Sequence, residues 1–142
     1  MIKIKKYNVQ ILLIFATALF ISCSSKEKYD MPEFVIEANA KYMNEENLEK
    51  VMGTIYKDSP AYQTSEMLIQ KLFEVYDLNY KIIDMKVLED NGSEAKVEFT
   101  QITTKISGPD FKDNKSTGIH LLKKEDDSWK IFSTQLNDVK YL

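Results

Sequence analysis

The spacing of apolar residues changes once along this chain, close to Asp77. Upstream of it, apolar side chains recur every three or four residues, which is the spacing of one helical face. Downstream, apolar and polar residues alternate, which is typical of strands with one buried face. Helices followed by strands predict an α+β domain, with N-terminal helices packed on a curved, mostly antiparallel sheet of about four strands.

Three helices are expected before Asp77. The first begins near Pro32, because proline suits the first turn of a helix, and the second follows Asn44 as its N-cap. The third starts after Ser59-Pro60 and has the clearest amphipathic pattern. We therefore expect the third helix to lie across the sheet as the main element of the core.

Strands are expected over residues 80–89, 95–106, 117–124 and 129–136, followed by a short tail over 137–142. The first two are joined by Asn91-Gly92, a pair that tolerates the positive φ angles of a tight hairpin turn. The sequence thus predicts an antiparallel meander, in which each strand pairs with the next along the chain.

The second strand contains a break in its alternation. Apolar residues occupy every second position as far as Phe99, and then Ile102, Thr104 and Ile106 take the other phase. A one-residue slip of this kind would turn the apolar set to the opposite face of the sheet. A bulge near Gln101 would accommodate the slip and bend the strand, so we expect a curved sheet.

The composition argues against a nucleic-acid partner. The chain has 142 residues, with 22 acidic residues against 19 basic ones, and every basic residue is a lysine. Phosphate binding draws on basic clusters and on the fork of the arginine side chain. The length allows one domain with a core of its own, and the single cysteine cannot form an internal disulfide.

The first 22 residues have the layout of a secretory leader. A short basic segment, residues 1–8, precedes a mainly apolar run over 9–21, and the small residue Ser22 follows. The apolar run is shorter than the ~20 residues that cross a bilayer as a helix. We interpret residues 1–22 as a signal peptide, with an uncleaved membrane anchor as the alternative.

The stretch Phe20-Ile21-Ser22-Cys23 resembles the lipobox of bacterial lipoproteins. The resemblance implies cleavage before Cys23 and fatty acyl groups, such as palmitate, carried by that residue. Residues 23–31 would then be the lipidated cysteine and a polar tether, and residues 32–142 the folded domain. This organisation places the protein on the bacterial cell membrane or the outer membrane, with the domain in the periplasm or outside the cell.

Two motifs in the strand region resemble the nuclear transport factor 2-like superfamily, whose members include SnoaL-like and cystatin-like cones. They are Asp127-Ser128-Trp129-Lys130-Ile131 and the alternation over residues 94–99. The likeness covers residues 32–136 and implies helices lining a cone-shaped sheet, in an uncharacterised lipoprotein branch. This chain has little room between its second and third helices for the superfamily's usual short strand pair.

Enzymes of that superfamily use carboxylates, His–Asp pairs and tyrosines inside the cone, so two residues are weighed as catalytic groups. His120 is the only histidine and shares a strand face with Leu122; a histidine at the surface or the edge of the core is the alternative. Asp84 would need to point inward to act as a base, whereas the alternation turns it outward. We assign no catalytic residue, no metal and no cofactor.

Several aromatic residues lie at positions that could line a cavity for an apolar ligand. Residues of this kind can equally be plain core. The candidate ligand-site residues are Tyr42, Tyr62, Tyr76, Phe99, His120 and Trp129.

The sequence therefore favours a lipid-anchored, non-enzymatic envelope domain that binds a small apolar ligand or a partner protein. Two alternatives stay open. One is an isomerase- or dehydratase-type enzyme that uses a carboxylate or the histidine inside the cone. The other is a structural module that forms a homodimer.

Overall fold

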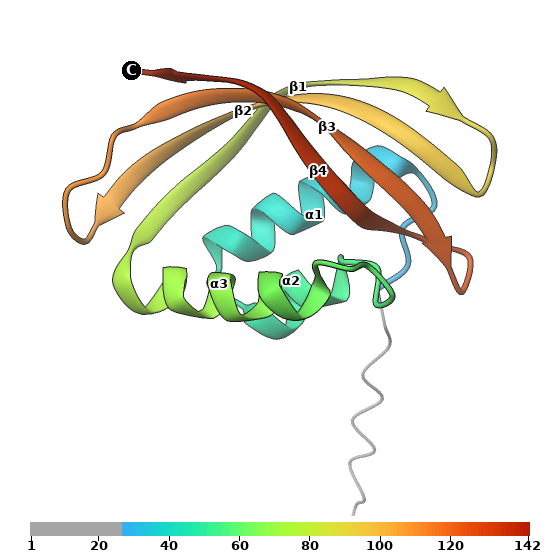
Figure 1. The fold of residues 1–142 in the computed structure, drawn as a ribbon, viewed down its shortest axis with the longest axis horizontal. Helices are drawn as coiled ribbons and strands as arrows, with labels where there is room; N and C mark the ends of the chain where they lie inside the picture. The colour runs from blue at the N-terminus through green and yellow to red at the C-terminus, as the bar shows by residue number, and fades with distance from the viewer. Residues whose placement is uncertain (1–26) are drawn as a thin grey trace, which may run out of the picture.

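The computed structural model describes residues 27–142, so the leader and Cys23 lie outside the described residues. Three helices come first and four strands follow, as the change of spacing near Asp77 predicted (Figure 1). The elements are α1 (Pro32–Asn44), α2 (Leu48–Gly53), α3 (Tyr62–Val75), β1 (Asp77–Asp90), β2 (Glu94–Ser107), β3 (Asn114–Glu125) and β4 (Ser128–Tyr141).

The four strands form one antiparallel sheet in the order β1-β2-β3-β4, which confirms the expected meander. The sheet arches over the helices, which all lie on its concave side (Figure 1). At the β1–β2 turn Gly92 adopts a φ of 90°, a conformation that glycine takes at little cost. The expectation of a curved α+β fold is confirmed.

The bulge expected near Gln101 lies in β1, not in β2. The pairing of β1 with β2 shifts between Ile82 and Asp84, opposite Gln101, whereas β2 pairs with β3 without interruption over this region. The alternation of β2 therefore does not slip. Thr103 stays on the concave face and is buried, and Ile106 is exposed.

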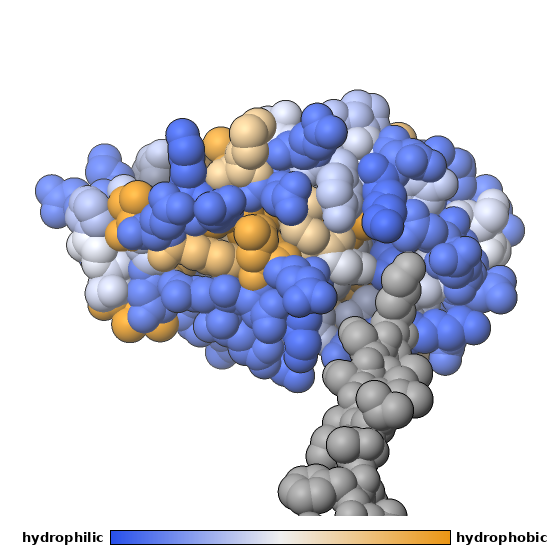
Figure 2. Space-filling model, turned by 90° about the horizontal axis from the view of Figure 1, so that it is seen from below, coloured by the Kyte–Doolittle hydropathy of each residue, from blue (hydrophilic) through white to orange (hydrophobic). Residues whose placement is uncertain are grey.

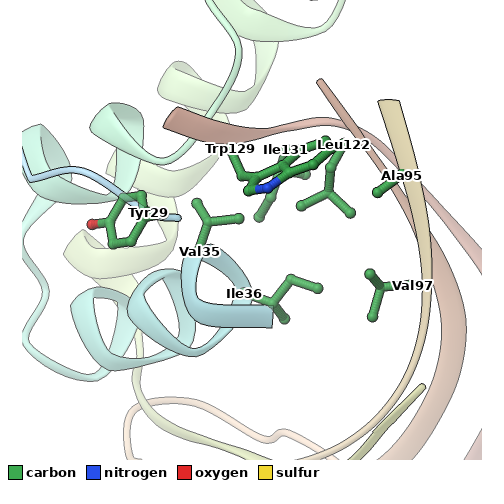
Figure 3. Packing of buried hydrophobic residues seen from close by; sticks show 8 residues of the cluster. All are labelled: Tyr29, Val35, Ile36, Ala95, Val97, Leu122, Trp129 and Ile131. Atoms are coloured by element: carbon green, nitrogen blue, oxygen red, sulfur yellow. The ribbon is translucent and has the colours of Figure 1, made fainter. Parts of the chain in front are cut away.

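The helix that packs on the sheet is α1, not α3 as we expected. Val35 and Ile36 of α1 are almost fully buried and point towards the concave face of the sheet (Figure 3). In contrast, no residue of α3 is fully buried, and Met67 and Leu68 are 61% and 63% exposed. A strong amphipathic pattern predicted a helix correctly but not how deeply it is buried.

Trp129 is the largest side chain of the core and is 1% exposed. It lies beside Leu122 and Ile131 of the sheet and faces Val35 of α1 (Figure 3). Tyr29, which precedes the first helix, belongs to the same cluster and is 8% exposed. The core is therefore concentrated at the end of the sheet where β4 begins.

The start of α2 differs from the expected one for an identifiable reason. Asn47, not Asn44, caps α2, by accepting a hydrogen bond from the backbone N–H of Lys50. The side chain of Asn44 instead bridges to β1, because its amide donates to the carbonyl of Tyr80 and its oxygen accepts from the Tyr80 N–H. The end of α1 is thereby fixed to the sheet.

The segment between α2 and α3 adds one bridge to the sheet. Ile55 pairs in parallel with Ile131 of β4, and backbone hydrogen bonds flank the pair. This bridge takes the place of the short strand pair for which the sequence had little room. β4 continues to Tyr141, so most of the expected tail, residues 137–142, is part of the strand.

Residues 27–30 pack against the domain, although the sequence had assigned them to a polar tether. The Tyr29 N–H donates to the Ser128 hydroxyl at 2.9 Å, and the Tyr29 carbonyl accepts from the Trp129 N–H at 3.0 Å. The carboxylate of Glu27 accepts hydrogen bonds from the hydroxyls of Tyr29 and Tyr42. We call residues 27–30 the strap. Within residues 27–142, no helix is long and apolar enough to cross a membrane.

Candidate functional site

A cavity of about 400 Å³ lies between the concave face of the sheet and the helices α1 and α3. It lies towards the end of the sheet that carries the β2–β3 loop, away from the Trp129 core. Its apolar lining comes from Ile36, Leu72, Leu78, Ile82, Leu136 and Val139. Its polar lining comes from Asn39, Gln101, Thr103, Asn114, Ser116 and Thr134, and its rings from Tyr80, Phe99, Phe111 and His120.

A stacked pair of rings forms one wall of the cavity. Phe99 of β2 and His120 of β3 have ring centroids 4.2 Å apart and planes that differ by 19°. Phe99 can lie flat against the sheet because its cross-strand neighbour is Gly118, which has no side chain. A Cβ at Gly118 would lie 3.0 Å from the Phe99 ring. The glycine therefore shapes the cavity wall.

His120 is held in the wall by an uncharged partner. Its Nδ1 lies 2.8 Å from the Oγ1 of Thr134, across the β3–β4 pairing. Burial disfavours the charged imidazolium and lowers the pKa of His120 to about 4. The imidazole is therefore neutral at pH 7.

We expect the imidazole of His120 to titrate with a midpoint near 4 in the folded chain and near 6.5 in the unfolded chain. Between these pH values the unfolded state binds the proton and the folded state does not, so this group lowers stability as the pH falls from 6.5 to 4. An NMR titration of the ring protons measures the midpoint directly, since the chain has one histidine. A folded-state midpoint near 6.5 would contradict the burial.

The described residues that line the cavity include no lysine and no carboxylate. Tyr80, the one phenol among them, stays protonated because burial raises its pKa to about 12. The lining therefore offers amide, hydroxyl and imidazole hydrogen-bonding groups between apolar and aromatic surfaces. An ionised ligand would lose its hydration here without meeting an opposite charge, which is costly. The geometry suits an uncharged small molecule.

Two of the six candidate ligand-site residues, Phe99 and His120, line this cavity. Tyr76 lies beside it, because its ring packs edge-on against Phe111, with centroids 5.8 Å apart. Trp129 does not line the cavity and belongs to the core. Asp84, the other group weighed as catalytic, is exposed and pairs with Thr100 on the outer face, as the alternation predicted.

Tyr42 and Tyr62 line a different hollow, a groove beside the strap. This groove is bordered by α2 and by the β3–β4 turn, and charges of both signs surround it, including Glu27, Lys50 and Lys130. Lys130 donates a hydrogen bond to the carbonyl of Gly53, and Glu27 is held by tyrosine hydroxyls. Glu27 and Lys130 thus already have partners within the fold, and the ammonium of Lys50 lies 5.1 Å from the centroid of the Tyr42 ring. Residues 27–142 contain no cluster of His, Cys, Asp or Glu that could hold a metal.

The polar groups of the cavity were missed at the level of sequence. Gln101 and Thr103 continue the inward phase of β2, although the expected slip would have turned them to the outer face, and Ser116 lies just before the residues expected for the third strand. The signal that could have identified them is the unbroken alternation itself. Polar residues at inward positions conflict with a purely apolar core, and such conflicts are expected at functional sites.

Comparisons with known proteins agree with this fold and connect the chain to a family. A family model described as "Anti-sigma-I factor RsgI9, C-terminal domain" matches residues 34–142. The anti-sigma-I factor RsgI9 of Acetivibrio thermocellus is 34% identical over 77 residues, which are 54% of this chain and 10% of that protein. The chain thus spans about a tenth of the length of that relative.

Solved structures share the architecture at low sequence identity. A putative scytalone dehydratase from Novosphingobium aromaticivorans aligns with a TM-score of 0.64 and 10% identity, over 76% of this chain and 83% of that one. A nuclear transport factor 2-like protein of unknown function from Shewanella oneidensis aligns with a TM-score of 0.56 and 15% identity, over 75% and 95%. These likenesses confirm the nuclear transport factor 2-like fold, and at this identity they show the fold alone.

Proposed function

The chain belongs to the family of the C-terminal domain of anti-sigma-I factor RsgI9. We propose that it is a lipid-anchored envelope domain that binds an uncharged small molecule in its cone cavity. The observation that carries the proposal is the lining of the cavity. Hydrogen-bonding groups without charge alternate there with aromatic and aliphatic surface, in a volume that suits a small ligand.

The same lining argues against the enzymatic alternative. A general base needs a pKa near the working pH and an orienting partner. His120 has a pKa of about 4 and lies against the hydroxyl of Thr134. No carboxylate is found among the described residues of the cavity wall. We therefore propose that the domain binds its ligand without converting it.

The proposed anchor is a lipid on Cys23, with residues 1–22 removed as a signal peptide and the domain in the periplasm or outside the cell. This part of the proposal depends on the lipobox resemblance and on the leader. Two acyl signals give stable membrane attachment where one chain is marginal. Labelled palmitate should join the protein in cells, and a Cys23→Ala variant should incorporate none and be released from the membrane. Label on the Cys23→Ala variant would contradict the anchor.

A matched pair of fluorescent probes tests the preference for an uncharged ligand. Phenylnaphthylamine and anilinonaphthalene sulfonate share the same rings, and the second adds a negative charge. We expect the neutral probe to bind with a rise in fluorescence and the sulfonate to bind much more weakly, because the cavity offers no positive charge. Equal binding of both probes would contradict the proposal.

We predict that Ser116→Leu abolishes binding of the neutral probe. Ser116 is 6% exposed and lines the cavity, so a larger apolar side chain there would fill the space that the probe occupies. The matched control is Thr117→Leu, the next residue of β3, whose side chain faces outward opposite Thr100. Fluorescence titration of the three proteins should separate them, and a Ser116→Leu variant that binds normally would exclude this cavity as the site.

Binding of a protein partner is the second candidate, and the surface supports it. Apolar side chains are exposed on the sheet, including Ile83, Leu88 and Ile106. The underside, seen in Figure 2, also carries apolar surface between two hydrophilic bands. The relative's name describes a protein that opposes a sigma factor, so the family includes a regulator of another protein. Solution scattering of the chain without its leader would reveal a dimer if the partner is a second copy.

A further inference from the structure

The strap ties the start of the described chain to one end of the domain. Tyr29 is buried in the core. Its backbone N–H donates to the Ser128 hydroxyl and its carbonyl accepts from the Trp129 N–H, both at the beginning of β4. Lys130 adds a contact from its ammonium to the Tyr29 ring, 5.5 Å from the centroid. The strap cannot leave this position without opening the core. Any tether that precedes the strap must therefore end by Glu27.

The covalent distance from Cys23 to Glu27 is short. Four residue steps separate their Cα atoms, and an extended chain covers at most about 14 Å over that length. A lipid carried by Cys23 therefore keeps Glu27, and the end of β4 that holds the strap, close to the bilayer surface.

The cavity lies at the opposite end of the same strand. Its β4 residues are Thr134, Leu136 and Val139, whereas the strap contacts Ser128 and Trp129. At a rise of about 3.3 Å per residue, Thr134 is about 20 Å and Val139 about 36 Å along the strand from Ser128. In Figure 1 the β3–β4 hairpin and the β2–β3 loop accordingly lie at opposite ends of the arch.

The surface charge does not draw the domain down onto a bilayer. Removal of the leader leaves all 22 acidic residues and takes away three of the 19 lysines. An anionic leaflet repels such a surface. The short tether thus holds one end of the domain at the membrane, while the net negative charge of the domain gives no overall attraction to an anionic leaflet.

We infer that the lipid-anchored protein stands with its strap end at the membrane and holds its cavity on the far side, so that the ligand enters from the aqueous compartment and not from the bilayer. This inference depends on the anchor proposed above. It deepens that proposal, because it restricts the ligand to molecules that reach the cavity through water. A lipid extracted from the anchoring membrane is excluded.

Quenching by headgroup-labelled lipids tests this orientation. Because the lipid occupies the only cysteine, a second cysteine is the sole free thiol of the mature protein. A fluorophore is placed either at Lys57→Cys, in the groove beside the strap, or at Asp110→Cys, in the exposed β2–β3 loop at the cavity end. The full lipoproteins are then reconstituted in vesicles that contain nitroxide-headgroup lipids, and the mass of each protein verifies its lipid.

We expect several-fold stronger quenching at position 57 than at position 110. Insertion of about 20 Gly/Ser residues between Lys26 and Glu27 should abolish the difference, because the domain would then drift away from the surface. Equal quenching at both positions, stronger quenching at 110, or a difference that survives the long linker would each overturn the inference. Absence of lipid on Cys23, read from the mass, would overturn the anchor and the orientation together.

Discussion

Trp129→Ala is expected to lower the free energy of unfolding by about 3–5 kcal/mol, because removal of a fully buried indole leaves a large void in a packed core. The ring lies between the sheet and α1 and is 1% exposed (Figure 3). Domains of this size have stabilities of about 5–15 kcal/mol in total. The variant should therefore be unfolded in a substantial fraction of molecules or unfold at a much lower denaturant concentration.

The matched control is Tyr141→Ala, an aromatic truncation near the other end of the same strand. Tyr141 is 63% exposed, so its removal should change the free energy of unfolding by less than about 0.5 kcal/mol. Urea denaturation of both variants, without the leader, measures the difference. Similar losses in the two variants would show that Trp129 is not at the centre of the core.

Gly118→Ala is expected to destabilise the domain by about 2–3 kcal/mol and to weaken binding of the neutral probe as well. The added methyl group would collide with the carbonyl oxygen of Gln135 and approach the Phe99 ring to 3.0 Å. Because β3 is paired on both sides, the backbone cannot move away without disturbing β2 or β4. The stacked pair of Phe99 and His120 would shift into the cavity.

Gly53→Ala provides the control for this substitution, with an effect of opposite sign. Gly53 ends α2, and a Cβ there would meet no atom within 4 Å. Alanine should therefore stabilise the domain by up to about 1 kcal/mol, because it loses less backbone freedom on folding than glycine does. Thermal unfolding of the two variants measures the sign and the size of both changes in stability. If Gly118→Ala leaves the stability unchanged, the close packing over β3 does not contribute to the stability of the domain.

The order of the elements could be predicted from the sequence because it depends on local spacing. The helical period before Asp77 and the alternation after it were sufficient to give the α+β class and the meander. The bulge was predicted in β2 near Gln101, from a slip of phase that β2 does not have, because Gln101 and Thr103 face the cavity. The structure has the bulge in β1, opposite Gln101.

The cavity could not be predicted, because it depends on how elements pack. α3 has a strong apolar stripe, yet it lies partly away from the sheet, and space for the cavity remains between α3 and the sheet. The inward polar residues Gln101 and Ser116 are ordinary surface types by composition. Tyr29 gave no signal either, since a single aromatic residue in a charged segment has no period. Its burial depends on contacts with residues about 100 positions away.

Native mass spectrometry of the protein purified from its own membrane shows whether the cone cavity of this anchored domain holds an uncharged small molecule. We expect the chain to carry an added mass that is released on unfolding. The same mass should be present on Thr117→Leu and absent from Ser116→Leu. An added mass that Ser116→Leu retains, or a wild-type chain that carries none, would exclude this cavity as the binding site.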